Sequence, residues 1–275
     1  MDNWEYFNSE LHYKYVNLLL KDLSLIEKAY LKFLRDGVDA QIDTTLSWYD
    51  EYYEDLTGLH DKEDFDDYYA DSFLEMILIT MMNNLLNHNR DYIHRFYMSG
   101  SNLGYNHMGK SSQFLPSDEE SLNILTDYTN TVVESINGEF NYGVRNILGE
   151  HIENGTLDQF KKDLIKLPYT PIDTHFSVDN RCIFTTKTEY ARGVNTGLLQ
   201  SYSNYGVDQY DWVTSGLSNV CKTCKGYEAG NPYTLNEIMG MMPCHPNCVC
   251  SVKARLPKIL YLQDKPQIVN MTPKK

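Results

Sequence analysis

Apolar residues recur every three or four positions through most of the chain, which is the spacing of one buried face of an α-helix. The first such stretch runs from about Ser9 to Asp36, where Gly37 is a typical helix stop. A second helix is predicted over 40–56. A third is predicted over about 61–97, because its acidic first turns suit the positive end of the helix dipole.

Residues 99–116 contain three glycines and a proline, a composition typical of a loop or linker. Helical spacing then returns in three further stretches, which predict helices over about 117–153, 157–167 and 180–205. The first of these begins with Ser117 and Glu120, the pattern of a capping box. Strand-like sequence is confined to 210–214 and 249–256.

Five of the six cysteines lie between positions 221 and 250. The C-K-T-C pair presents two thiols at the spacing of a metal hook, and P-C-H-P-N-C-V-C returns further ligands after about twenty residues. Sulfur and nitrogen ligands favour a structural Zn²⁺. Spacing does not settle which four residues bind the metal, and Cys244 could be a bystander. The candidate ligands are Cys221, Cys224, His245, Cys248 and Cys250.

Three other chemistries compete with a zinc site as explanations of these cysteines. Disulfides require an oxidising compartment, and nothing in the sequence indicates one. A thioredoxin-like redox pair would need a βαβ pattern, which is missing. A zinc deaminase would use His151-Ile-Glu153 with a later P-C-x-x-C, but Val220 replaces the proline and surplus ligands would close the metal. We therefore do not expect an enzyme.

These patterns predict a mostly α-helical fold with a small zinc-stapled β element near the C-terminus, α+β overall. We expect an acidic helical region over 1–98, a linker over 99–116, a second domain over 117–256 and an extended tail over 257–275. The metal element should occupy 208–256. Because it can bury little apolar surface, metal binding should supply much of its stability.

The net charge of −14 is unevenly distributed. Residues 1–180 hold 13 Lys/Arg against 32 Asp/Glu, whereas residues 181–275 hold 11 against 6. This distribution does not favour a general nucleic-acid binder, although the basic part could contact a phosphate backbone. The N-terminus has no signal-peptide pattern, and no apolar run could span a bilayer, so we expect synthesis in the cytoplasm and no membrane partner.

One group of motifs, taken together, resembles the pattern of a known protein family. The segment from Cys182 to Gly197, with T-E-Y-A-R at its centre, is followed by D-W-V-T-S-G, the C-x-x-C pair and H-P-N-C-V-C. Their order and spacing resemble the Mu F-like head morphogenesis family of tailed phages and proviruses. The resemblance covers about residues 117–256. Val249 stands where that family usually has Arg, and Cys244 is an additional thiol.

The resemblance implies a minor head protein, a virion component inside the head or at the portal, made in the host cytoplasm. Its expected partners are the portal protein and capsid or scaffold proteins, with packaged DNA as a further candidate. The implied role is in head assembly, and in some members of the family it extends to DNA packaging or ejection. It implies no catalytic activity and no small-molecule substrate. A zinc-dependent nucleic-acid-binding protein is the alternative, supported by the basic residues after position 180.

Overall fold

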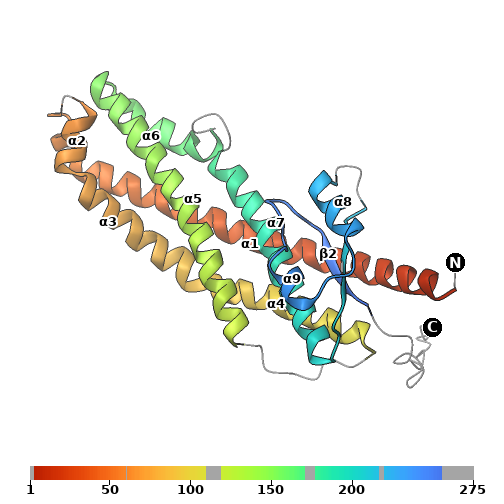
Figure 1. The fold of residues 1–275 in the computed structure, drawn as a ribbon. Coiled ribbons are helices and arrows are strands. Elements are labelled where there is room, and N and C mark those ends of the chain that lie inside the picture. The colour runs from red at the N-terminus through yellow and green to blue at the C-terminus, as the bar shows by residue number, and fades with distance from the viewer. Residues whose placement is uncertain (1–2, 60, 110–118, 171–176, 217–219, 256–275) are drawn as a thin grey trace, which may run out of the picture. The chain divides into compact units, whose positions relative to one another are not determined.

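The protein is described by a computed structural model that covers residues 3–59, 61–109, 119–170, 177–216 and 220–255 (Figure 1). For residues 3–24, 62, 66 and 67 only the backbone is described. The elements in chain order are α1 (Asn3–Leu56), α2 (Lys62–Tyr68), α3 (Ala70–Met81), the π-helix η1 (Met82–Leu86), α4 (Asn87–His107), α5 (Glu119–Glu153), α6 (Leu157–Lys166), the 3-10 turn η2 (Leu167–Tyr169), α7 (Val178–Asn204), β1 (Tyr210–Val213), α8 (Lys222–Ala229), α9 (Leu235–Met239) and β2 (Ser251–Ala254).

The expected fold class is confirmed, because helices dominate the described chain and β1 and β2 form a small sheet near its end. The two strands pair antiparallel, with Trp212 opposite Val252 and Tyr210 opposite Ala254. All four of these side chains are buried, whereas the alternate positions are partly exposed. This alternation is the pattern of a sheet that covers a core on one face.

Gly37 does not end a helix, as we had predicted, but lies inside the continuous helix α1. A β-carbon at this position would overlap the side chain of Leu85. The glycine therefore permits close packing of α1 against η1, rather than breaking the helix. The predicted pair of helices over 9–36 and 40–56 is corrected to one element.

The predicted loop over 99–116 is also corrected in its described part, because α4 continues through residues 99–107. Gly100 lies against α7, where a β-carbon would overlap the carbonyl oxygen of Val194. Its small size serves helix–helix contact, so a glycine-rich composition was misleading here. The remainder of that stretch, from 110 to 116, lies outside the described residues, as does the predicted tail over 257–275.

The helix predicted over 61–97 is divided into α2, α3, η1 and α4. Asp61 caps α2 by accepting a hydrogen bond from the backbone N–H of Asp64 at 3.0 Å. Around α2 and α3 the core is aromatic: Trp48 packs edge-on against Phe65 and Phe73 and stacks on Tyr52. Large rings of this kind account for much of the apolar area that such a core buries.

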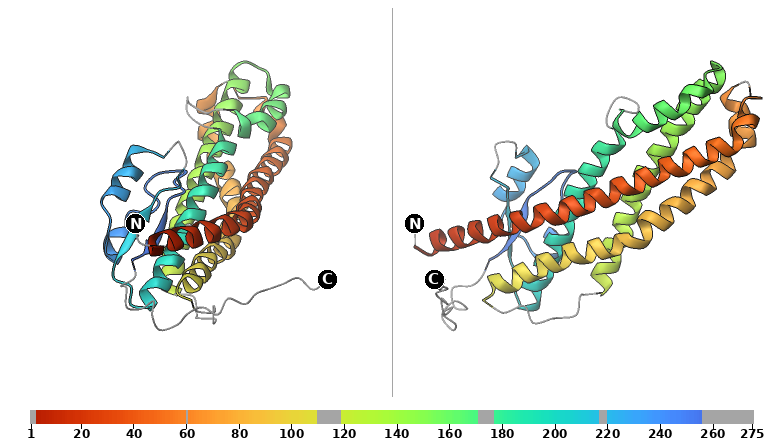
Figure 2. Two further views of the ribbon diagram at one scale, coloured as in Figure 1. Left: turned by 90° about the vertical axis from the view of Figure 1, so that its right-hand side faces the viewer. Right: turned by 180° about the vertical axis from the view of Figure 1, so that it is seen from behind.

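The chain forms two compact units, each built from two separate segments. Unit 1 comprises residues 1–94 and 120–190, and unit 2 comprises 95–119 and 191–275. The boundaries between the units fall after residue 94 within α4, after residue 119 at the start of α5, and after residue 190 within α7. Figure 2 shows unit 1 as long helices and unit 2 as the strands and short helices with parts of α4 and α7. Within the described residues no helix combines the length and apolarity needed to cross a membrane.

Candidate metal centre

The Cys221–Cys224 hook is formed by the first turn of α8. Cys221 is the N-cap of this helix, and its Sγ accepts a hydrogen bond from the backbone N–H of Cys224 at 3.3 Å. Cys224 is itself almost fully buried. The cap thus positions the first thiol, and the first helical turn positions the second.

The second hook is a tight turn between α9 and β2. The backbone N–H of Cys248 donates to the carbonyl of His245 at 3.1 Å, and Asn247 adopts a left-handed conformation with φ of 63°. His245 Nδ1 lies 2.7 Å from the carbonyl oxygen of Pro246, so this nitrogen is the donor. The Nε2 atom, on the thiol side, then keeps a free lone pair for a metal.

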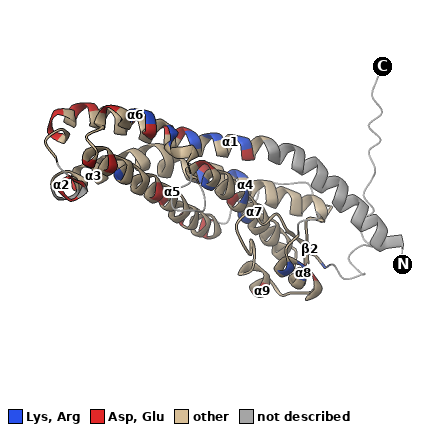
Figure 3. Cartoon of the chain, turned by 90° about the horizontal axis from the view of Figure 1, so that it is seen from above, with Lys and Arg blue, Asp and Glu red and all other residues tan. Residues whose placement is uncertain are grey.

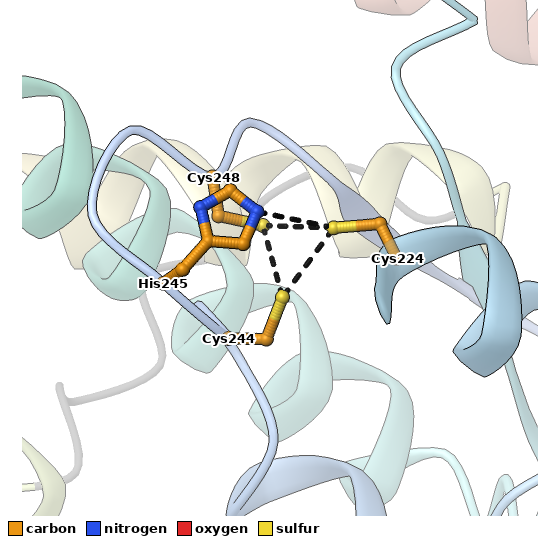
Figure 4. A group of neighbouring side chains, drawn as sticks. All are labelled: Cys224, Cys244, His245 and Cys248. Atoms are coloured by element: carbon orange, nitrogen blue, oxygen red, sulfur yellow. Dashed lines mark hydrogen bonds between the residues drawn. The ribbon is translucent and has the colours of Figure 1, made fainter. Parts of the chain in front are cut away.

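Four side chains converge closely enough to hold one ion: Cys224, Cys244, His245 and Cys248 (Figure 4). Their ligand atoms all lie within 4.8 Å of one another. Cys224 Sγ is 3.4 Å from Cys244 Sγ, 3.8 Å from Cys248 Sγ and 3.4 Å from His245 Nε2, and Cys244 Sγ is 3.8 Å from Cys248 Sγ.

These separations fit a tetrahedral zinc site. With Zn–S bonds of ~2.3 Å, two sulfur ligands of a tetrahedron lie ~3.8 Å apart, and a sulfur and a nitrogen lie slightly closer. The distances from Cys224 to the other three ligand atoms, and between the thiols of Cys244 and Cys248, are therefore compatible with a tetrahedral metal site. A set of three thiols and one imidazole is also among the common structural zinc sites.

Cys244, a possible bystander by its sequence spacing, thus belongs to this four-residue ligand set. Of the five predicted ligands, Cys224, His245 and Cys248 lie in that set, and Cys221 and Cys250 lie beside it. The Sγ atom of Cys221 is 3.2 Å from His245 Nε2. The thiol of Cys250 interacts with those of Cys224 and Cys248. In the sequence, Cys244 is marked only by its position next to His245, and the ligand-spacing motifs do not include that position.

The surroundings of the thiols favour deprotonation at two positions. The pKa of Cys221 is lowered to about 7, chiefly because the backbone N–H of Cys224 donates to its sulfur. The pKa of Cys248 is lowered to about 4, first by a hydrogen bond from the Cys250 thiol. Burial instead raises the pKa of Cys244 to about 11. Thiolates are the species that bind metals. The thiols of Cys221 and Cys248, whose pKa values are lowered, would therefore bind a metal first, and the metal would then deprotonate thiols with a raised pKa, such as Cys244.

The cluster is supported from α7 and from β1. Asn195, buried in α7, donates from its amide nitrogen to the carbonyl oxygen of Cys250 at 3.0 Å, and the hydroxyl of Ser251 lies 3.1 Å from its amide oxygen. Asn231 follows α8 and bonds the backbone N–H and carbonyl of Trp212. These contacts join the segments that carry the two hooks.

His151, which a zinc deaminase would use as a metal ligand, forms side-chain contacts elsewhere. Its Nδ1 lies 2.8 Å from the Thr156 hydroxyl and its Nε2 lies 3.2 Å from the Asp163 carboxylate. It is a residue of the last turn of α5, where a histidine suits the negative end of the helix dipole. Thr156 and Asp163 thus tie the end of α5 to α6.

Comparison with protein-family models, with curated proteins and with solved structures finds no match.

Proposed function

We propose that this chain is a structural minor head protein of a tailed phage or provirus. The observation that carries the proposal is the succession of helix, strand, cysteine hook and returning H-P-N-C-V-C turn, in the order of the Mu F-like motifs. Glu189 and Arg192 belong to α7, Trp212 to β1, and the cysteines to the hooks that flank α8 and β2.

The buried contacts of motif residues support a structural rather than catalytic role. Glu189 is 2% exposed and accepts a hydrogen bond from the Thr129 hydroxyl at 2.9 Å, so it is a core residue of unit 1. Trp212 is fully buried in β1. Such positions serve the fold, whereas a catalytic carboxylate must reach a substrate.

Zn²⁺ is the metal that we propose for the cluster, in a structural role. Three thiols and one imidazole complete a tetrahedron, whereas a catalytic zinc keeps one position for water. When bound, the ion would hold the α8 hook and the His245 turn together, and so would hold β1 and β2 in register. The protein then acts as a scaffold, without a small-molecule substrate.

The expected partners are the portal protein and capsid or scaffold proteins, with the packaged DNA as a further candidate, and the chain is expected in the head or at the portal. Quantitative mass spectrometry of purified particles tests this. A few copies per particle that co-purify with heads and are missing from tail fractions would support the proposal. Abundance in infected cells without incorporation would contradict it, and salt-sensitive DNA binding by the same purified protein would then favour the nucleic-acid alternative.

A further inference from the structure

An apolar surface lies on the outer side of α3 and the first residue of η1. It consists of Leu78, Ile79 and Met82, which are 48%, 52% and 53% exposed. Met82 is four residues from Leu78 and three from Ile79, so the three side chains share one helix face. We call these three residues the α3 apolar face. Exposed large apolar residues gathered in this way mark interaction sites more often than isolated ones do.

The inner side of the same helix already has its partners. Phe73, Ile77 and Met81 are buried, with at most 3% of their surface exposed. The core of unit 1 therefore does not need the α3 apolar face. Met82 is exposed where Met81 is buried, so only one member of this methionine pair remains available to adapt to a partner.

The surroundings of this face are strongly acidic. Residues 36–75 contain fourteen Asp and Glu but a single Lys. The net negative charge of this segment is therefore nearly as large as that of the whole protein, −14. Asp71 and Glu75 are exposed and lie about two turns and one turn, respectively, before the face on α3 itself. Figure 3 shows acidic residues on α2 and α3. A partner that approaches here meets a negative potential.

The neighbouring helix contributes further negative charge. The hydroxyls of Thr80 and Thr44 are 3.3 Å apart, which places α1 beside α3 at the level of the face. Asp43, next to Thr44, is exposed, whereas Asp50 two turns further along α1 is paired with Lys161 of α6 and is not part of this surface. Exposed carboxylates thus lie on α3 and on the adjacent α1 near the apolar face, and a polar rim beside an apolar centre is the usual arrangement of a protein interface.

We propose that the α3 apolar face binds a basic amphipathic helix of a partner protein. Apolar side chains of that helix would pack on Leu78, Ile79 and Met82, and its flanking Lys and Arg would pair with the acidic rim. A second copy of this chain is disfavoured as the occupant, because two acidic rims would repel each other. The π-helical turn that begins at Met82 adds support, since such turns often lie at functional sites.

This inference does not depend on the proposed function or on the metal centre, because it concerns only described residues of unit 1. A binding measurement on the purified full chain therefore tests it separately. The probe is a fluorescent 18-residue peptide of Leu and Lys, arranged so that the leucines form one helical face. A second peptide has the same composition in scrambled order and cannot form such a face.

We expect the amphipathic peptide to bind at least tenfold more tightly than the scrambled one. The double variant Ile79→Ser/Met82→Ser should lose at least tenfold in affinity, and Asp71→Asn/Glu75→Gln should weaken binding and its dependence on salt. The matched control is Ile124→Ser/Tyr128→Ser, which removes two exposed apolar side chains four residues apart on α5. It should change the affinity less than twofold.

Equal binding of the two peptides would overturn the proposal, because charge alone would then explain the affinity. An equal loss in the α5 control would overturn it as well. Circular dichroism of each variant verifies that the helices remain folded, so a lost affinity can be assigned to the surface. If sedimentation showed a dimer that the Ile79→Ser/Met82→Ser variant abolishes, a second copy would be the occupant and the proposal would be wrong.

Discussion

The side-chain amide of Asn195 in α7 donates a hydrogen bond to the backbone carbonyl of Cys250, the residue that leads from the cysteine cluster into β2, at 3.0 Å. Asn195 is 3% exposed, and its amide oxygen is 3.1 Å from the Ser251 hydroxyl. One helical side chain therefore holds the start of β2. The contact explains how a two-stranded sheet that is too small to be stable by itself is kept in place.

Replacement of Asn195 by Ala should destabilise unit 2. The change leaves the buried carbonyl of Cys250 without this donor, which typically costs ~1–3 kcal/mol. Thermal unfolding of the metal-loaded protein measures the effect as a lower midpoint. The matched control is Gln200→Ala on the same helix, which removes an exposed hydrogen bond to Asn204 and should change stability little. An equal loss in both variants would show that Asn195 has no special role.

Chelation of the metal should open the cysteine element while the helices of unit 1 stay folded. Cys182 reports on this, because it is fully buried in unit 1 and burial raises the pKa of its thiol to about 12. At pH 8 it holds almost no thiolate and should not react with iodoacetamide. Mass spectrometry should find the five cluster thiols alkylated after chelation and protected before it. Alkylation of Cys182 together with them would mean that unit 1 had unfolded as well.

Substitution of Gly100 by Ala should destabilise the contact between α4 and α7. The new methyl group would overlap the carbonyl oxygen of Val194, which is backbone and cannot rotate away. We expect a loss of ~1–3 kcal/mol in the free energy of unfolding, measured with denaturant. Gly138→Ala on α5 is the control, because nothing lies within 4 Å of its β-carbon position. It should stabilise by ~0.5–1 kcal/mol through helix propensity, so the two variants should differ in sign.

Glu27→Gln should change how stability depends on pH. Burial raises the pKa of Glu27 above its ordinary value of 4.5, and Lys187 only partly offsets this. A raised pKa in the folded state means that the native protein loses stability as the pH rises from 4.5 through the folded pKa. The neutral glutamine should remove this loss. The variant should therefore be more stable than the native chain above that pH window and equally stable below it. Thermal melts from pH 4 to 8 test this.

The control for Glu27 is Glu153→Gln, at an exposed position at the end of α5. It removes the same charge without relieving any burial. A pH-dependent gain of equal size in this control would assign the effect to the overall net charge instead of to the position of Glu27.

The sequence predicted the helical body and most of the cysteine cluster, because three-and-four spacing and ligand spacing are local signals. The prediction from sequence failed where one residue type can play two different structural roles. Gly37 and Gly100 were interpreted as breakers, although each permits close helix packing whose partner lies far along the chain. Cys244 was set aside since no spacing motif includes it, and only the folded turn brings its thiol beside Cys224. The short helices α8 and α9 carry too few turns for a periodic signal.

The two units alternate along the chain, since each is assembled from two stretches separated by a stretch of the other. A truncation that removes residues 1–98 would delete parts of both, so point substitutions are the better means of separating their roles. The same arrangement has a genetic consequence. A single recombination crossover cannot exchange one unit for a homologous one, because its coding sequence is not contiguous. The units are therefore expected to be inherited together, and changes in one would be selected in the presence of the other.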